Sequence, residues 1–370
     1  MPKFDIASIW RNVKELDLQP IRAAAERQVW IAIVGATGSG RHTLADQLRT
    51  DPRRPEVQTF TPVAILDLAH AAEARTADLI LLVVDVSQPD LAAEQQALTD
   101  YLAGGQRAIV LHNKIDLLPQ GDTVIPSLVG RAPLAFASAT DWAQLQRELA
   151  PKIAAALPGL SLALGRSFPM LRETVARNLI NETSSANAAY SFSTGLAELI
   201  PILDIPLNIA DIIVLTKAQA ILVYKLGLAF GMSTDWQYYL TEFSGVIGGG
   251  FLWRQVARSL VGLIPAWGIV PKVAVAYSGT YAVGQAVVVW YLTGRHATRK
   301  MLRGFSQQAF ERGKSIGRTL TKGVRRPRGT QTPALSSGGT RVCPHCGVSN
   351  DEDAKFCKAC GQPLGEQELS

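Results

Sequence analysis

A short polar segment that follows an apolar run carries the most specific chemistry in this chain. The segment is Asn113-Lys114-Ile115-Asp116, and the apolar run before it covers residues 107–112. The two oxygens of a carboxylate can accept two hydrogen bonds from one edge of a guanine ring, whereas adenine lacks that pair of donors. We therefore expect Asp116 to recognise guanine and predict that the chain binds GTP or GDP.

A glycine-rich loop earlier in the chain is suited to hold phosphate. Its residues are Gly35-Ala36-Thr37-Gly38-Ser39-Gly40-Arg41-His42-Thr43. Glycines let the backbone wrap an anion, and the N–H groups at a helix start point toward it. The usual pattern is G-x-x-x-x-G-K-[ST], so Arg41 replaces the lysine and His42 replaces the hydroxyl ligand of Mg²⁺. Imidazole is a poor Mg²⁺ ligand, and Thr43 could serve only if the loop shifts. A glycine-rich turn without a ligand is the alternative.

Two further segments would complete such a site. Asp67-Leu-Ala-His70 ends a later apolar run, where a D-x-x-G segment would hold Mg²⁺ through water and sense the γ-phosphate; His70 replaces the glycine. Ser138-Ala139 follows the last apolar run, where a backbone N–H could meet O6 of guanine. No glutamine follows Asp67 at the place expected for a water-positioning residue. The sequence therefore supports nucleotide binding more strongly than nucleotide hydrolysis. We expect Mg²⁺ to bind together with the nucleotide.

These segments need a scaffold that holds them together. The sequence pattern of residues 29–158 predicts one of alternating strands and helices. Five short apolar runs are bounded by turn signals: Val29–Val34, Val63–Leu68, Leu79–Val86, Ala108–Leu111 and Leu134–Ala137. Helical patterns lie between or after them: Thr43–Leu48, Leu91–Leu102 and Trp142–Ala156. The fold class is therefore α/β, with a mostly parallel sheet and helices on both faces.

Residues 29–156 resemble the small Ras-like P-loop GTPases, closest to the Era/TrmE branch, through the guanine segment, part of the glycine-rich loop and the Asp67 segment. The resemblance implies these roles: Asn113 and Lys114 brace the base and the loop, Asp116 recognises guanine, Ser138 and Ala139 support the base, and Gly35, Gly40 and Arg41 cradle phosphates. Mg²⁺ ligation is not transferred to His42. A nucleotide-dependent change would occur in residues 59–71, with Thr59 or Thr61 as the switch threonine. A pseudo-GTPase that binds without efficient turnover is the alternative.

Residues 165–294 predict an all-α apolar domain. The run Val273–Gly294 has 22 residues without a charge, which span about 33 Å as a helix and so could cross a bilayer core of about 30 Å. Small residues recur along it at Ala274, Ser278, Ala282 and Ala286, as in closely packed membrane helices. We expect membrane association, with a hairpin as the simplest topology. A soluble helical domain with buried apolar helices is the alternative.

Two other apolar segments, 205–231 and 246–270, contain charges and are weaker candidates for a crossing. The whole block 165–294 resembles an uncharacterised helical domain found behind bacterial Era-like GTPase domains and usually regarded as membrane-associated. The resemblance rests on the segment Ile200–Pro206, the apolar helix after it and Gly231.

The remaining segments suggest how the chain meets its surroundings. Residues 1–28 predict an N-terminal amphipathic helix, residues 295–328 hold eleven Lys/Arg against one acid, and residues 329–341 predict a flexible linker. The basic segment suits anionic lipid headgroups, with nucleic acid the less expected partner. The N-terminus lacks the apolar core of a signal peptide, so we expect the α/β domain on the cytosolic side of a bacterial-type inner membrane.

Four cysteines form two C-x₂-C pairs with ten residues between the pairs: Cys343, Cys346, Cys357 and Cys360. Four thiolates at this spacing predict a structural Zn²⁺ site, so residues 342–364 predict a small cytosolic zinc ribbon. A disulfide pair or redox site is the alternative, and the ribbon's protein partner is unknown.

Together these features predict a membrane-associated guanine-nucleotide-binding protein, a slow GTPase that acts as a switch or scaffold. The alternatives are a non-hydrolysing scaffold and a soluble GTPase factor bound to RNA or the ribosome.

Overall fold

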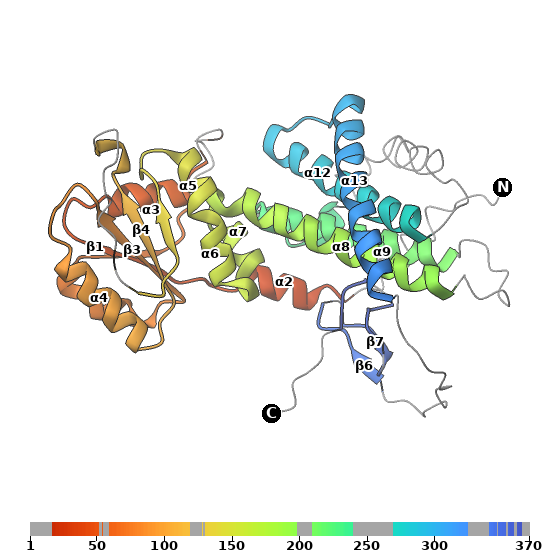
Figure 1. The fold of residues 1–370 in the computed structure, drawn as a ribbon, viewed down its shortest axis with the longest axis horizontal. Helices are drawn as coiled ribbons and strands as arrows, with labels where there is room; N and C mark the ends of the chain where they lie inside the picture. The colour runs from red at the N-terminus through yellow and green to blue at the C-terminus, as the bar shows by residue number, and fades with distance from the viewer. Residues whose placement is uncertain are drawn as a thin grey trace. The chain divides into compact units, whose positions relative to one another are not determined.

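A computed structural model describes the chain at the following residues: 17–51, 54, 59–118, 128, 130–197, 209–239, 269–324, 340–345, 347–352, 354–358 and 361–364 (Figure 1). The chain folds into two compact units. One comprises residues 24–175 with 228–231, and the other comprises 1–23, 176–227 and 232–370.

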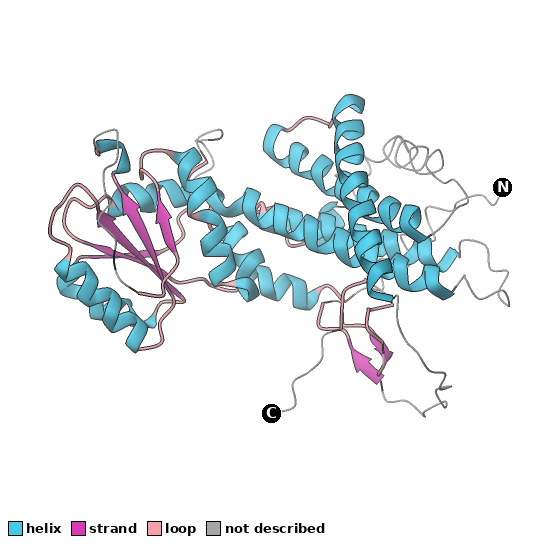
Figure 2. Cartoon of the chain, viewed as in Figure 1, coloured by secondary structure: helices cyan, strands magenta, loops and turns pink. Residues whose placement is uncertain are grey.

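The first unit is built on a five-stranded parallel sheet (Figure 2). Its strands are β1 (Ile31–Gly35), β2 (Val63–Leu66), β3 (Leu79–Asp85), β4 (Ala108–Asn113) and β5 (Leu134–Phe136), in the order β2-β1-β3-β4-β5. Every residue of β1, β3 and β4 is buried. The predicted α/β architecture with a parallel sheet is therefore confirmed, because parallel strands covered on both faces consist of continuous apolar runs.

Helices and 3₁₀ turns connect these strands. They are α3 (Arg41–Arg49), η1 (Leu68–Thr76), α4 (Ala92–Ala103), η2 (Ile115–Leu117), α5 (Trp142–Glu148), α6 (Ala150–Ala156), η3 (Pro158–Leu160), α7 (Ser161–Ser167) and η4 (Pro169–Leu171). Side chains of α4 and η1 pack on one face of the sheet, and Tyr101 belongs to that cluster. The alternate strand residues, such as Ile33 and Leu81, are equally buried on the opposite face.

Two element boundaries differ from the sequence prediction for identifiable reasons. The predicted helix Trp142–Ala156 is two helices, because Pro151 has no N–H and is tolerated only in a first turn, where it lies in α6. The predicted strand Val63–Leu68 ends at Leu66, because the carboxylate of Asp67 caps η1 by accepting from the N–H of His70.

The described part of the second unit is helical up to residue 324, as predicted, and is followed by the cysteine-containing segment. Its long helices are α8 (Arg172–Ala197), which begins in the first unit, α9 (Ile209–Ala229), which ends in it, α12 (Ile269–Thr293) and α13 (Arg299–Val324). The described part of the predicted N-terminal helix is α2 (Gln19–Glu26), with Pro20 in its first turn. The predicted segments 200–206 and 246–268 lie outside the described residues.

Helix α12 is the one described helix that is long and apolar enough to cross a membrane, yet 67% of its most apolar stretch is buried within the protein. Much of that burial comes from α13. A Cβ atom added at Gly313 of α13 would lie 2.7 Å from Cα of Ala274, so the two helix backbones pass very close. Val273 and Tyr277 of α12 share an apolar cluster with Ala309 of α13. A core helix of a soluble protein has the same properties as α12.

Candidate functional site

The polar residues singled out in the α/β unit lie mainly at the carboxyl edge of its sheet. Strand β4 ends at Asn113, which is paired in register with Asp85, the last residue of β3. The glycine-rich loop follows β1, and Ser138-Ala139 follows β5. In open α/β sheets this edge is where ligands bind.

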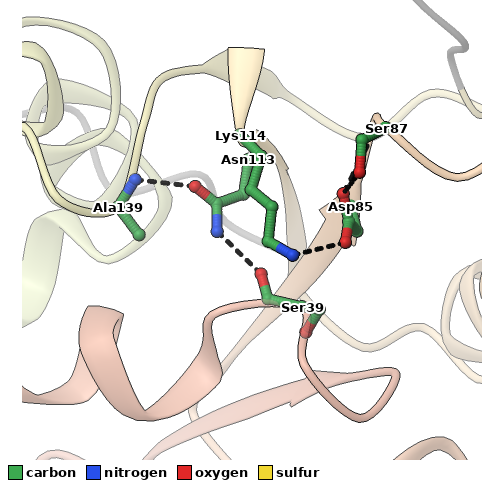
Figure 3. A network of polar contacts seen from close by, with 6 residues as sticks. All are labelled: Ser39, Asp85, Ser87, Asn113, Lys114 and Ala139. Carbon is green, nitrogen blue, oxygen red and sulfur yellow. Dashed lines mark hydrogen bonds and ion pairs between the residues drawn. The ribbon is translucent and has the colours of Figure 1, made fainter. Parts of the chain in front are cut away.

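Asn113 joins three of these segments through one side chain (Figure 3). Its Nδ2 donates to the carbonyl oxygen of Ser39 at 2.7 Å, and its Oδ1 accepts from the N–H of Ala139 at 2.6 Å. The side chain is buried, with 2% exposure. Asn113 therefore ties the end of β4 to the glycine-rich loop and to the segment after β5.

The glycine-rich loop approaches its neighbours so closely that side chains are excluded. A Cβ atom at Gly35 would lie 2.4 Å from the carbonyl oxygen of Val83, and one at Gly40 would lie 2.2 Å from Nδ2 of Asn113. Gly40 also has a φ of 99° and immediately precedes α3, where it offers no capping side chain. The N–H groups at the start of α3 therefore have no side-chain cap from this position, as an anion site requires.

The other predicted residues of the loop differ in exposure. Gly38 and His42 are exposed, whereas Arg41 and Thr43 are half-buried in the first turn of α3. The structure thus places the arginine and threonine partly inside the fold at the start of the helix, with the imidazole in solvent.

Lys114 adopts a left-handed backbone conformation, with a φ of 65°. Its Nζ donates to Oδ2 of Asp85 at 2.6 Å. The second carboxylate oxygen, Oδ1, accepts from the N–H and the hydroxyl of Ser87 at 3.0 and 2.6 Å. Burial alone would raise the pKa of Asp85, but the hydrogen bonds from Lys114 and Ser87 outweigh it and hold that pKa below its ordinary value.

Sequence reasoning missed Asp85. The available signal was its place directly after the apolar run of β3, with Ser87 two residues beyond. That place predicts a residue at the carboxyl edge of the sheet.

Asp67 is already engaged by a neighbour. Its Oδ1 accepts from the N–H of His70 at 3.1 Å and lies 2.7 Å from Nδ1 of the same residue. The side-chain hydrogen bond lowers the pKa of Asp67 and raises the pKa of His70. A magnesium ion held by Asp67 through water would therefore compete with the imidazole of His70.

The residues predicted to bind the base, Asp116, Ser138 and Ala139, differ in their exposure and in their hydrogen bonds. Asp116 is exposed within η2, two residues beyond Lys114. Ser138 is buried; its N–H donates to Oε1 of Gln144 at 2.9 Å, and its hydroxyl bonds that of Thr140. The N–H of Ala139, expected to face guanine O6, donates to Asn113 in this structure. Gln144 is a second residue that the sequence did not indicate.

A separate cysteine-containing module lies near residue 350. It contains the antiparallel strands β6 (Thr340–Val342) and β7 (Ser349–Asp351). Cys343 and Cys357 are buried, while Cys346 and Cys360 lie outside the described residues. The N–H of His345 donates to Sγ of Cys343 at 3.4 Å, and Nδ2 of Asn350 donates to Sγ of Cys357 at 3.6 Å. Donors that face sulfur stabilise thiolate, so the described residues fit a zinc site.

Comparison with known proteins identifies this module. A family model for the zinc-ribbon domain matches residues 342–364, and no curated protein matches the chain. The chain therefore carries a zinc-ribbon domain at the predicted residues, and this domain indicates zinc as its metal.

Proposed function

We propose that this chain is a guanine-nucleotide-binding protein that associates with a membrane. The observation that carries the nucleotide part is the double hydrogen bond of Asn113, which links the glycine-rich loop to Ala139. The loop would hold phosphates, and the residues joined by Asn113 would hold the base. The α/β unit is thus a G domain in this proposal, with the glycine-rich loop as its P-loop.

Asp116 would supply guanine specificity. Its side chain is exposed and lies two residues beyond Lys114, so it is accessible to a ligand from solvent. Ser138 would support the base, and the N–H of Ala139 would donate to guanine O6 once Asn113 releases it or shares it.

Hydrolysis would be slow or absent. Arg41 is a planar fork where a compact ammonium is usual, and His42 is exposed and a poor Mg²⁺ ligand. Mg²⁺, if bound with the nucleotide, would have Thr43 as a candidate oxygen ligand, and Asp67 would hold it through water in place of its contact with His70. The chain would then act as a switch or scaffold.

The membrane part of the proposal rests on the outer face of α13. Its exposed cations are Arg299, Lys300, Arg303, Arg318 and Lys322, whereas Arg312, although exposed, lies over the ring of Tyr277 of α12. A crossing by α12 would carry the packed, charged α13 into the hydrocarbon, which is costly. We therefore place the contact at the lipid headgroups, on the cytosolic side. A soluble, RNA-associated factor is the second candidate, because phosphates of nucleic acid attract the same charges.

Titration calorimetry of the full, zinc-loaded chain with GDP, GTP and ATP tests the nucleotide proposal. GDP and GTP should bind, and ATP should bind about 100-fold more weakly or worse, since two hydrogen bonds to a charged group contribute about 1.5–3 kcal/mol each. Absence of binding by both GDP and GTP would overturn the proposal.

Two substitutions at Asp116 sharpen that test. Asp116→Ala should lose discrimination between GDP and ADP. Asp116→Asn exchanges one acceptor for a donor, so it should weaken GDP binding and favour xanthosine diphosphate, which carries an oxygen at C2. Asp100→Ala, which removes an exposed aspartate on α4, is the matched control and should bind GDP normally.

A further inference from the structure

The ion pair between Asp85 and Lys114 crosses between the ends of two neighbouring strands. Asp85 pairs in register with Asn113, and Lys114 is the next residue along the chain. The N–H of Val86 also donates to the carbonyl oxygen of Asn113 at 3.2 Å. Residues 113 and 114, which precede Asp116, are therefore held at the end of β3 by one main-chain hydrogen bond and one side-chain ion pair.

Asp85 is a buried anion whose contacts hold it in one orientation. It is 5% exposed, and a buried carboxylate is tolerated only when it is paired and hydrogen-bonded. Lys114 Nζ occupies one oxygen, while the N–H and hydroxyl of Ser87 occupy the other. The carboxylate is thus held by contacts with the protein itself.

Lys114 needs such a fixed partner. It is the one non-glycine residue with a positive φ among the residues that the structure describes. An L-residue in the left-handed region is strained, so a contact that favours this conformation also favours the turn that follows it. That turn leads directly into η2, which contains Asp116.

We propose that Asp85 is a positioning residue for guanine recognition, acting through Lys114 to fix the segment 113–116. The pair also neutralises the Lys114 ammonium, which leaves the phosphates to Arg41 and to backbone N–H groups. This inference rests on the proposed function, because it assigns Asp85 a role in the same nucleotide site.

A double-mutant cycle on the full, zinc-loaded chain tests this role. Asp85→Asn and Lys114→Met should each weaken GDP binding by about tenfold or more. The double variant should bind GDP with an affinity no lower than that of the single variant that binds it less tightly, because both substitutions remove the same contact. Additive losses would overturn the proposal. Asp78→Asn is the matched control, since Asp78 accepts from the N–H of Trp30 in the same unit, and it should bind GDP normally.

The ratio of GDP to inosine diphosphate affinity separates positioning from mere stabilisation. Inosine lacks the exocyclic amine that Asp116 would recognise, so displacement of the 113–116 turn should lower this ratio in Asp85→Asn. A general loss of stability leaves the ratio unchanged, and an unchanged ratio would count against positioning. Ser87→Ala retains the ion pair and provides a milder variant if Asp85→Asn does not fold. It should lower the ratio of GDP to inosine diphosphate affinity by about two- to threefold. An unchanged ratio in Ser87→Ala would overturn the proposal.

The outcomes also distinguish this inference from the proposed function. If the unsubstituted chain binds no guanine nucleotide, both fail. If it binds GDP and Asp85→Asn binds GDP equally well, the proposed function stands and the positioning role of Asp85 is wrong.

Discussion

Thr61 Oγ1 donates to the carbonyl oxygen of Ser167 at 2.7 Å, and the hydroxyl of Thr59 donates to the same oxygen at 2.8 Å. Ser167 is the last residue of α7, where backbone carbonyls lack partners within the helix. The segment before β2 is thereby fastened to the connection that leads into α8. In the proposed switch, movement of residues 59–71 would be transmitted to the start of α8 through this oxygen.

Removal of both hydroxyls should loosen this attachment. Thr59→Val/Thr61→Val deletes two hydrogen bonds worth about 0.5–1.5 kcal/mol each, so the free energy of unfolding should fall by about 1–3 kcal/mol in urea titrations without nucleotide. Thr99→Val, which removes a hydroxyl bonded to a carbonyl within α4, should change it by less than about 0.5 kcal/mol. Equal stability of the double variant and the unsubstituted chain would contradict the attachment.

The Asp67–His70 contact predicts a pH dependence with a definite sign. The pKa of His70 is raised and that of Asp67 is lowered, chiefly by their mutual hydrogen bond. The His70 contribution to stability is complete below the ordinary histidine pKa and is lost as pH rises through the raised value. The Asp67 contribution is present above the ordinary aspartate pKa and is lost as pH falls through the lowered value.

Imidazole proton shifts measured by NMR against pH check this contact. Asp67→Asn should return the pKa of His70 toward its ordinary value, whereas Asp78→Asn should leave it unchanged. Since protonated His70 holds Asp67, Mg²⁺ should strengthen nucleotide binding more at pH values above the raised pKa of His70. A His70 pKa that is insensitive to Asp67→Asn would show that the contact is absent in solution.

Arg41→Lys should strengthen GDP binding or raise the rate of single-turnover GTP hydrolysis. A compact ammonium fits beneath β- and γ-phosphates, whereas a guanidinium is a wider planar fork. Arg107→Lys, an exposed exchange before β4 and therefore at the amino edge of the sheet, is the control. If neither affinity nor turnover changes, Arg41 does not contact phosphate.

The sequence predicted best those features that depend on local pattern. Strands such as β3 and β4 were evident because strands buried on both faces need unbroken apolar runs. The cysteine spacing indicated the zinc-ribbon domain because one tetrahedral metal needs two close pairs of thiolates. The residue type of Asn113 and its place at the end of an apolar run predicted a role in the site, and the structure connects it to the loop.

Features that depend on tertiary approach were missed. Asp85 meets Lys114 across 29 residues of sequence, and no local pattern indicates which side chain a strand-terminal aspartate will contact. Gln144 likewise reaches Ser138 from the first turn of α5. The charge of the basic segment 295–328 was evident from its sequence. Its packing against α12 through Gly313 and Ala309 of α13 was not.

Zinc removal should unfold the ribbon and leave the α/β unit folded. The ribbon has only two short strands among its described residues, so metal binding must supply most of its folding free energy. Elemental analysis should show that a chelator releases one zinc ion per chain. NMR spectra should then show a loss of amide chemical-shift dispersion for residues 340–364 and no change in the resonances of β3 and β4. Cys357→Ser should lower the zinc content, whereas His345→Ala should retain it; zinc loss in His345→Ala would make the imidazole a ligand.

Charge removal from α13 should weaken membrane binding in proportion to the cations lost. Each exposed Lys or Arg near an anionic surface contributes about 1 kcal/mol, so Arg318→Gln/Lys322→Gln should lower partitioning onto anionic vesicles by about 30-fold in flotation assays. Arg107→Gln, a cation of the other unit, should partition normally, and zwitterionic vesicles should bind every variant weakly. Because α12 is covered by α13, high salt should release the chain from native membranes; retention through both salt and carbonate washes would instead show that a helix crosses the bilayer. Strong binding to RNA, with none to anionic vesicles, would favour the soluble factor.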